Sequence, residues 1–222
     1  MADRLEPSEE EKSKFAAEAR KANAEARKFE AEADVAEMER KAKQLVMDIM
    51  YANDSHYRVY RFDMSVSDKS VEACINELSV WSRLDPGCDM KIIFNSPGGD
   101  VVNGMALFDF LIDLRSKGHT LTTVSQGYAA SMAGILLQAG DVRQVGRESW
   151  ILIHEISAGM MGSYGELSDR LKWVEKVQER VLRIFAERST LSIDELRVKW
   201  LRTDWWISSD EALELGIVDE VV

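Results

Sequence analysis

A serine among small residues is the first feature of the sequence that could do chemistry. Ser131 ends the run Gly127-Tyr128-Ala129-Ala130-Ser131, between an expected buried strand at 121–125 and an expected helix at 131–138. Nucleophilic serines of α/β enzymes occupy strand-to-helix turns of this kind, where small neighbours admit a substrate backbone. A serine that only caps the helix fits the same pattern, so the run alone leaves both interpretations open.

A base for this serine must be a histidine, because a hydroxyl needs a neutral imidazole to take its proton. Of the three histidines, His56 begins a strand and His119 lies in a polar turn. His154 ends a buried apolar strand, where a parallel sheet delivers side chains to its carboxyl edge. We predict that His154 is the base, with a hydrogen-bonded core histidine as the alternative. Glu155 after it makes no zinc motif, because the sequence has no H-E-x-x-H.

A second glycine-containing segment, Ser96-Pro97-Gly98-Gly99, follows an expected strand at 91–95. Its backbone N–H groups would be exposed at the sheet edge that carries Ser131. Together with the N–H of Met132 they could form an oxyanion hole. A plain turn is the alternative for this tetrapeptide.

The elements that must position these residues alternate between strands and helices after residue 55. We expect strands at 56–62, 91–95, 121–125, 150–154 and 217–222. We expect helices at 67–83, 102–116, 131–138, 165–188, 193–200 and 209–215. This alternation implies parallel strand pairing with right-handed crossovers.

The first fifty residues have a different composition. None of the 13 glycines precedes Gly87, and Ala, Glu, Lys and Arg dominate the opening. A helix is expected from the capping segment at 7–11 to about Tyr51. A heptad seam runs along it through Phe15, Ala19, Ala22, Ala26, Phe29, Ala33 and Ala36. Such a helix either associates with a copy or partner, or stays single and is held by Glu–Lys pairs. We therefore expect a helical extension at 1–54 and a globular domain at 55–222.

Composition excludes several classes of function. The chain has 28 Lys and Arg against 39 Asp and Glu, a net charge of −11, which disfavours binding to nucleic acid or anionic membrane. No apolar stretch reaches the length of a membrane span, and the acidic first 14 residues are unlike a signal peptide, so a cytoplasmic location is expected. Cys74 and Cys88 are too few for a disulfide framework or zinc site, and we expect no metal or cofactor.

Taken together, the motifs at 95–99, 127–132 and 153–154 and the closing segment 203–219 resemble the proteolytic subunit of the Clp protease, ClpP. The resemblance runs from about Arg58 to Val222. It implies an α/β fold of the ClpP/crotonase type, a stacked β-β-α superhelix, here with a long coiled-coil-like N-terminal helix. It also implies a Ser-His-Asp peptidase with Ser131 as nucleophile, His154 as base and Asp204 as the orienting aspartate. Gly99 and Met132 match the oxyanion donors.

The same resemblance implies how a protein or peptide substrate binds. An extended substrate would add as a strand between two segments of backbone, at 98–101 and after His154. The residues in these segments are Gly98, Asp100, Val101, Glu155 and Ile156. Side chains that could shape the pocket are Met105, Tyr128, Met160 and Met161. The region from Glu155 to Arg188 matches the handle, a strand and a long helix that interleave between two rings.

The chain departs from the family pattern at several places. Tyr128 stands where the family usually has Gln, and Glu155-Ile156 stands where Gln-Pro is common. Thr203 replaces an Arg that takes part in ring-to-ring contacts. We therefore expect a homo-oligomeric, heptamer-like ring and leave a second ring open.

The helix before the domain replaces a short axial segment that meets an unfoldase in ClpP. A Clp-like peptidase with such an extension resembles the ClpP-type prohead proteases of tailed phages, which assemble with scaffold and cut capsid proteins. We expect a self-assembling endopeptidase for capsid maturation. The alternatives are a proteolytic subunit that works with a AAA+ unfoldase, a catalytically lapsed assembly or scaffold subunit and, ranked low, a crotonase-fold acyl-CoA enzyme.

Overall fold

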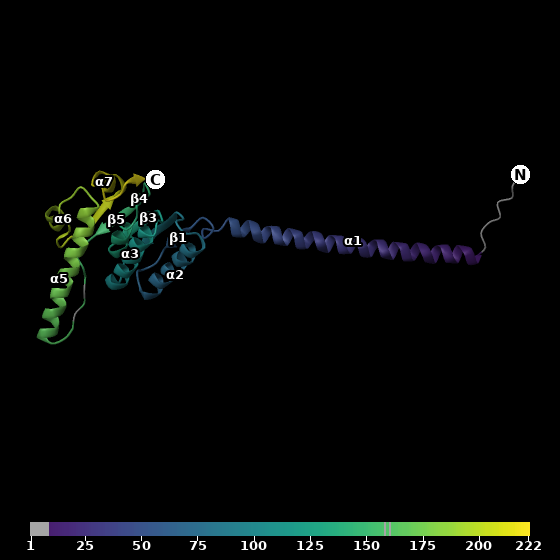
Figure 1. The fold of residues 1–222 in the computed structure, drawn as a ribbon, viewed down its shortest axis with the longest axis horizontal. Coiled ribbons are helices and arrows are strands. Elements are labelled where there is room, and N and C mark those ends of the chain that lie inside the picture. Colours follow the sequence, from purple (N-terminus) through teal and green to yellow (C-terminus); the bar gives the residue numbers. More distant parts are fainter. Residues whose placement is uncertain (1–8, 158, 160) are drawn as a thin grey trace. The chain divides into compact units, whose positions relative to one another are not determined.

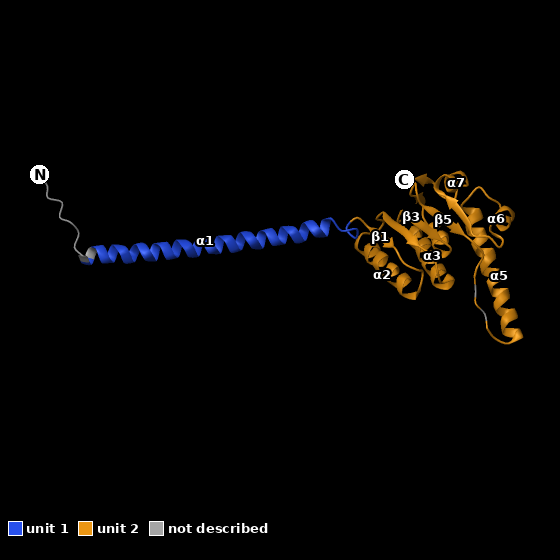
Figure 2. Ribbon diagram, turned by 180° about the vertical axis from the view of Figure 1, so that it is seen from behind, with its two compact units in different colours: residues 1–56 blue, residues 57–222 orange. Residues whose placement is uncertain are grey.

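The computed structural model describes residues 9–157, 159 and 161–222. The chain divides into two compact units, residues 1–56 and 57–222 (Figure 2). Helix α1 (Glu9–Tyr51) accounts for most of the first unit and ends at the expected residue. The start expected at Pro7 and Ser8 lies outside the described residues.

Helix α1 is held by local interactions. Ion pairs with a spacing of four residues lie along its described part, among them Glu10–Lys14, Lys28–Glu32 and Glu37–Lys41. Exposed pairs of this kind stabilise a helix by only about 0.3–0.5 kcal/mol each. Phe15 and Phe29 are 70% and 71% exposed, so the apolar seam is not buried within a single chain.

The second unit is built on one sheet in which parallel pairs dominate (Figure 1). The strands β1 (Val59–Phe62), β2 (Met90–Ser96), β3 (Leu121–Ala130), β4 (Val142–Val145) and β7 (Glu220–Val221) lie side by side in the order β1-β2-β3-β4-β7. The long strand β3 pairs with β4 through its first half and with β5 (Trp150–Ile153) through its last three residues. Strand β6 (Trp205–Ser208) pairs antiparallel with β5. This mixed α/β architecture confirms the expected fold class.

Helices connect the strands and pack against the sheet. They are α2 (Asp68–Leu84), α3 (Val101–Ser116), α4 (Met132–Leu137), α5 (Tyr164–Glu187), α6 (Ile193–Trp200) and α7 (Ser209–Glu214). The starts of α5 and α6 follow from sequence, because Ser163 with Glu166 and Ser192 with Glu195 form capping boxes. Figure 1 shows the N-terminal end of α5 projecting away from the sheet.

Three expectations about local structure are wrong. The four-residue strands β4 and β6 are not among the expected strands, because they carry no long periodic pattern. The strand that the resemblance places after His154 is not formed among the described residues 154–157, 159 and 161–163. The terminal strand expected at 217–222 is limited to Glu220–Val221. His119 directly follows a turn at Lys117 and Gly118 and is itself buried: its Nε2 lies 2.8 Å from Ser82 Oγ and its Nδ1 lies 3.0 Å from the Cys88 carbonyl oxygen.

Candidate active site

Ser131 occupies a sharp turn between the end of β3 and the start of α4. Its backbone has φ 55° and ψ −122°, in a region that L residues other than glycine rarely adopt. The Ser131 N–H donates to the Leu152 carbonyl at 2.8 Å, which fixes the turn to β5. The Ser131 side chain makes no capping hydrogen bond to α4. The alternative of a simple capping serine is therefore wrong, and the hydroxyl remains available for chemistry.

The glycine segment after β2 lies directly against this turn. A Cβ on Gly98 would sit 2.5 Å from the Ala130 carbonyl oxygen and 2.8 Å from the Ser131 Cβ, so only glycine fits. Val66 pairs with one edge of the segment: its N–H donates to the Gly98 carbonyl at 2.8 Å and its carbonyl accepts from Asp100 at 2.9 Å. Because N–H groups alternate in direction along an extended backbone, the Gly99 N–H points away from Val66, toward the side on which the segment lines the cavity.

His154 and Asp204 lie at the ends of two short strands that pair with each other. His154 comes directly after β5, and Asp204 comes directly before β6. The last antiparallel pair between these strands joins Ile153 to Trp205, so His154 and Asp204 are the first residues beyond the ladder. His154 is half-buried and Asp204 is exposed. In the described part of the chain, no hydrogen bond joins His154 to either Ser131 or Asp204. Catalytic contacts of this kind often tighten only around substrate.

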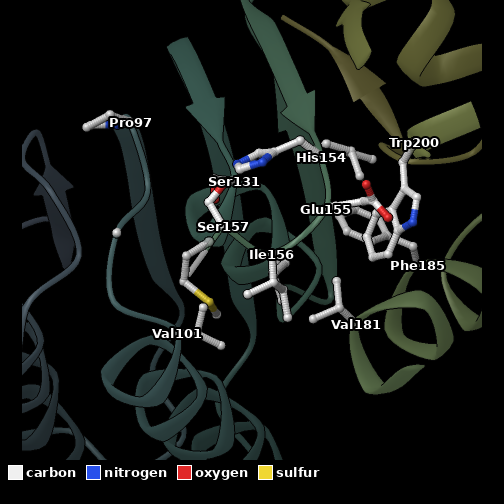
Figure 3. A pocket seen from close by; sticks show the side chains of 14 residues that line it. Pro97, Val101, Ser131, His154, Glu155, Ile156, Ser157, Val181, Phe185 and Trp200 are labelled. Atoms are coloured by element: carbon white, nitrogen blue, oxygen red, sulfur yellow. The ribbon is translucent and has the colours of Figure 1, made fainter. Parts of the chain in front are cut away.

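A cavity of about 270 Å³ lies beside the serine. Figure 3 shows the imidazole of His154 directed toward Ser131 across its upper part. Five more of the expected site residues line it, namely Gly99, Val101, Met132, Glu155 and Ile156.

The structure does not bring every expected residue into this cavity. The Asp100 carboxylate caps α3, accepting from the Asn103 backbone N–H at 2.7 Å, and its own N–H is bonded to Val66. Gly98 is buried and does not line the cavity, and neither does Asp204. Of the side chains expected to shape the pocket, Met105 lines a separate hollow against α5, and Tyr128 and Met161 line neither. Met160 lies outside the described residues.

Sequence reasoning missed the apolar wall of the cavity. Val181 and Phe185 from α5 and Trp200 from the end of α6 line it together with Ile135 and Ile153. All three helical side chains are nearly fully buried. The helical spacing of Val174, Val181 and Phe185 was visible as an amphipathic stripe, but sequence spacing cannot show that this stripe faces Ser131. An apolar wall of this size favours an apolar substrate side chain.

Comparison with known proteins identifies the family. Residues 40–222 match the Clp protease family. The chain belongs to the Clp protease family. It is 30% identical over 169 residues to an ATP-dependent Clp protease proteolytic subunit of Bacteroides fragilis, covering 74% of this chain and 79% of that protein. A protein of the same description from Bacteroides thetaiotaomicron is also 30% identical, over 74% of each chain.

As a member of the Clp protease family, the protein is a serine-type endopeptidase. The family match begins within α1, so residues 9–39 of that helix precede the matched region. None of the helices in the part of the chain that the structure describes is both long and apolar enough to cross a bilayer. Among the same residues, no three His, Cys, Asp or Glu side chains gather as metal ligands would.

Proposed function

We propose that this Clp protease family member is a self-assembling endopeptidase that uses Ser131, His154 and Asp204 as its catalytic residues. The observation that carries the proposal is the orientation of the His154 imidazole toward Ser131, which occupies a strained turn without capping its helix (Figure 3). In this proposal residues 55–222 form the peptidase domain, and residues 1–54 form an extension that serves assembly.

The chemistry follows from where the groups lie. Ser131 Oγ attacks the carbonyl carbon of the scissile peptide bond, and the imidazole of His154 takes the hydroxyl proton. The N–H groups of Gly99 and Met132 stabilise the oxyanion that forms on the carbonyl oxygen. His154 then returns the proton to the departing amine, and water hydrolyses the acyl-enzyme by the same route. Asp204 keeps the imidazole in the required tautomer.

Substrate binds as an extended strand along the free edge of the glycine segment. Val66 already occupies the other edge, so the cavity side is where a peptide can pair with the backbone of Gly98 to Val101. The backbone of Glu155 and Ile156 lies along the other edge of the substrate, opposite the glycine segment. The wall of Val181, Phe185 and Trp200 accepts an apolar side chain next to the scissile bond.

Labelling with a fluorophosphonate probe tests the proposed nucleophile. We expect the assembled protein to be labelled at Ser131 and to hydrolyse a fluorogenic peptide. Ser131→Ala should abolish both, whereas Ser125→Ala, in the same strand but outside the cavity, should abolish neither. An assembled, folded protein without labelling at Ser131 would instead favour the lapsed assembly subunit.

We further propose that the peptidase forms a homo-oligomeric ring and matures a phage capsid. Helix α1 supports this role: it is 43 residues long and exposed at every described side chain, and it offers a surface for scaffold or for other copies. The test is incubation of the purified protein with the capsid and scaffold proteins encoded beside its gene, without nucleotide. Specific cleavage supports the role, and stable capsid proteins in the presence of an active peptidase contradict it.

The descriptions of the relatives favour a second candidate, the proteolytic subunit of an ATP-dependent protease. In that case a folded, tagged protein is degraded only when a AAA+ unfoldase and ATP are present. Short peptides are cleaved in both cases, so the folded substrate is the measurement that separates the two roles.

A further inference from the structure

The Glu155 side chain makes a hydrogen bond to a distant segment of the chain. Its Oε2 accepts a hydrogen bond from the backbone N–H of Arg202 at 2.9 Å, between residues 47 positions apart in the chain. Figure 3 shows the Glu155 side chain directed toward Trp200 and away from Ser131. The carboxylate therefore contacts the segment between α6 and β6, which leads to Asp204.

That segment contains a strained residue. Arg202 has φ 53°, in the left-handed region that residues with a Cβ adopt only at a cost. The turn around it is closed by a hydrogen bond from the Thr203 N–H to the Trp200 carbonyl at 3.2 Å. A charge-assisted hydrogen bond that the Arg202 N–H donates to the Glu155 carboxylate offsets the strain of this turn.

The turn matters because the strand ladder ends too early to place Asp204. The β5–β6 pairing stops at Ile153 and Trp205, one residue short of His154 and Asp204. The orientation of Asp204 relative to His154 thus depends on the turn at Arg202. The hydrogen bond between Glu155 and Arg202 connects that turn to the residue next to His154.

We propose that Glu155 is a positioning residue, whose carboxylate holds the Arg202 turn so that Asp204 is presented to His154. This inference rests on the proposed Ser131–His154–Asp204 peptidase. It adds the requirement that the side chain at position 155 be long enough to accept a hydrogen bond from the Arg202 N–H. The role belongs to the side chain and is separate from any pairing of the Glu155 backbone with substrate.

Two conservative variants separate the effect of side-chain length from the effect of charge. Glu155→Gln keeps an oxygen at the same distance along the side chain and removes the charge. Glu155→Asp keeps the charge but shortens the side chain by one carbon–carbon bond, about 1.5 Å, so that it falls short of the Arg202 N–H. We expect kcat/KM of the Gln variant to fall by roughly threefold to tenfold, because a neutral amide oxygen is a weaker acceptor than a carboxylate. We expect the Asp variant to lose roughly 10–100-fold, because a displacement of about 1 Å in a catalytic group has effects of this size.

The division of the loss between kcat and KM distinguishes positioning from substrate binding. A displaced catalytic group slows the chemical step, so the main loss in Glu155→Asp should lie in kcat rather than in KM. A loss confined to KM would instead assign Glu155 to the substrate pocket and overturn the proposal.

Relief of the strain at Arg202 provides a rescue test. In the Glu155→Asp background, Arg202→Gly permits the left-handed backbone without the hydrogen bond. If Glu155→Asp lowers kcat/KM 100-fold, the added Arg202→Gly should raise it again by at least tenfold. Arg202→Ala removes the same side chain but keeps the strain, and it should recover nothing. Equal recovery by both variants, or by neither, would overturn the inference.

Failure of this inference can be told apart from failure of the peptidase. If the parent protein is not labelled at Ser131 by a fluorophosphonate, the proposed function itself fails. If the parent is labelled and Glu155→Asp is labelled at the same rate across the pH range, the peptidase stands and Glu155 is not its positioning residue.

Discussion

The backbone of Gly98 lies in contact with the turn that carries Ser131. A Cβ at position 98 would stand 2.8 Å from the Ser131 Cβ and 2.8 Å from the Met132 nitrogen, both shorter than real Cβ contacts allow. The glycine has φ 82°, so a side chain there is also disfavoured by its own backbone. The spacing between the proposed nucleophile and its proposed oxyanion donors is therefore set by the absence of one methyl group.

We predict that Gly98→Ala inactivates the enzyme without unfolding it. The new methyl group pushes the 98–101 segment away from Ser131 and separates the N–H groups of Gly99 and Met132. The loss of one oxyanion donor lowers kcat by roughly 10²–10³. Gly118→Ala is a matched control, because Gly118 has a similar φ of 92° but no atom within 4 Å of its Cβ position.

In urea unfolding, both glycine variants should be destabilised by roughly 1–2 kcal/mol through their positive φ, and Gly98→Ala by more, because its methyl group also meets backbone atoms. Peptide hydrolysis should fall only in Gly98→Ala. Similar activities in the two variants would show that the close approach at Gly98 is not needed for catalysis.

Removal of the proposed catalytic groups should produce losses of graded size. Ser131→Ala and His154→Ala should each lower kcat by about 10⁶ if the three residues act as a unit. Asp204→Asn should lose roughly 10⁴, because the imidazole is left in the wrong tautomer. Asp210→Asn, an exposed acid at the start of α7, is the control and should change kcat/KM less than twofold. Near-parental hydrolysis in any of the first three variants would remove that residue from the proposed site.

The sequence predicted the elements that carry long periodic patterns. Helices α2, α3, α5 and α6 lie within a residue or two of their expected bounds, since apolar spacing and the serine caps at 163 and 192 specify them locally. Strands β4 and β6 could not be predicted, because four residues hold too little pattern and their pairing is specified by distant partners. The terminal strand shrinks from 217–222 to Glu220–Val221 for the same reason.

The candidate site also contains residues that the sequence indicated and residues that it did not. Ser131 and His154 stood out because each follows an apolar strand, and their neighbours Gly98 and Gly99 because of their residue type. Asp204 has no local signal that distinguishes it from the other acidic residues, and only its similarity to a known family singled it out. The wall of Val181, Phe185 and Trp200 depends on how α5 and α6 pack against the sheet, which no spacing in the sequence expresses.

Arg143 and Asp219 should make stability depend on pH. Arg143 is nearly buried, and its guanidinium donates to the Asp219 carboxylate at 2.6 Å and 3.0 Å. Burial acts to raise the pKa of Asp219, but the hydrogen bonds from the Arg143 side chain and backbone outweigh it and hold that pKa below its ordinary value. Because the folded pKa is lowered, the stabilisation is complete above the ordinary carboxyl value of about 4 and is lost as the pH falls below it.

Asp219→Asn measures this contribution. At pH 7 the variant should lose about 1–2 kcal/mol of unfolding free energy, since a hydrogen-bonded charge is replaced by a weaker acceptor and the Asp219 side chain, 39% exposed, is partly screened by solvent. The difference from the parent should shrink when urea unfolding is repeated near pH 3. Asp113→Asn, in the exposed pair with Lys117, should cost less than about 1 kcal/mol at either pH. A difference for Asp219→Asn that is the same at both pH values would refute the linkage.

Truncation of helix α1 should change the assembly. The described part of α1 buries nothing within one chain, and Phe15 and Phe29 are more than two-thirds exposed. Packing of these side chains against another copy would remove apolar area from water, worth about 25 cal/mol per Å². We predict that a chain starting at Asp48 has a lower oligomeric mass in sedimentation velocity but still hydrolyses short peptides.

Paired substitutions separate the heptad seam from the rest of α1. Phe15→Glu with Phe29→Glu places two charges 14 residues apart on the seam and should lower the oligomeric mass as truncation does. Ala17→Glu with Ala31→Glu has the same spacing and the same added charge but lies off the seam, so it should leave the mass unchanged. If the chain starting at Asp48 keeps the full oligomeric mass, α1 is not an element of self-association, and a capsid or scaffold protein becomes the partner to test for this helix.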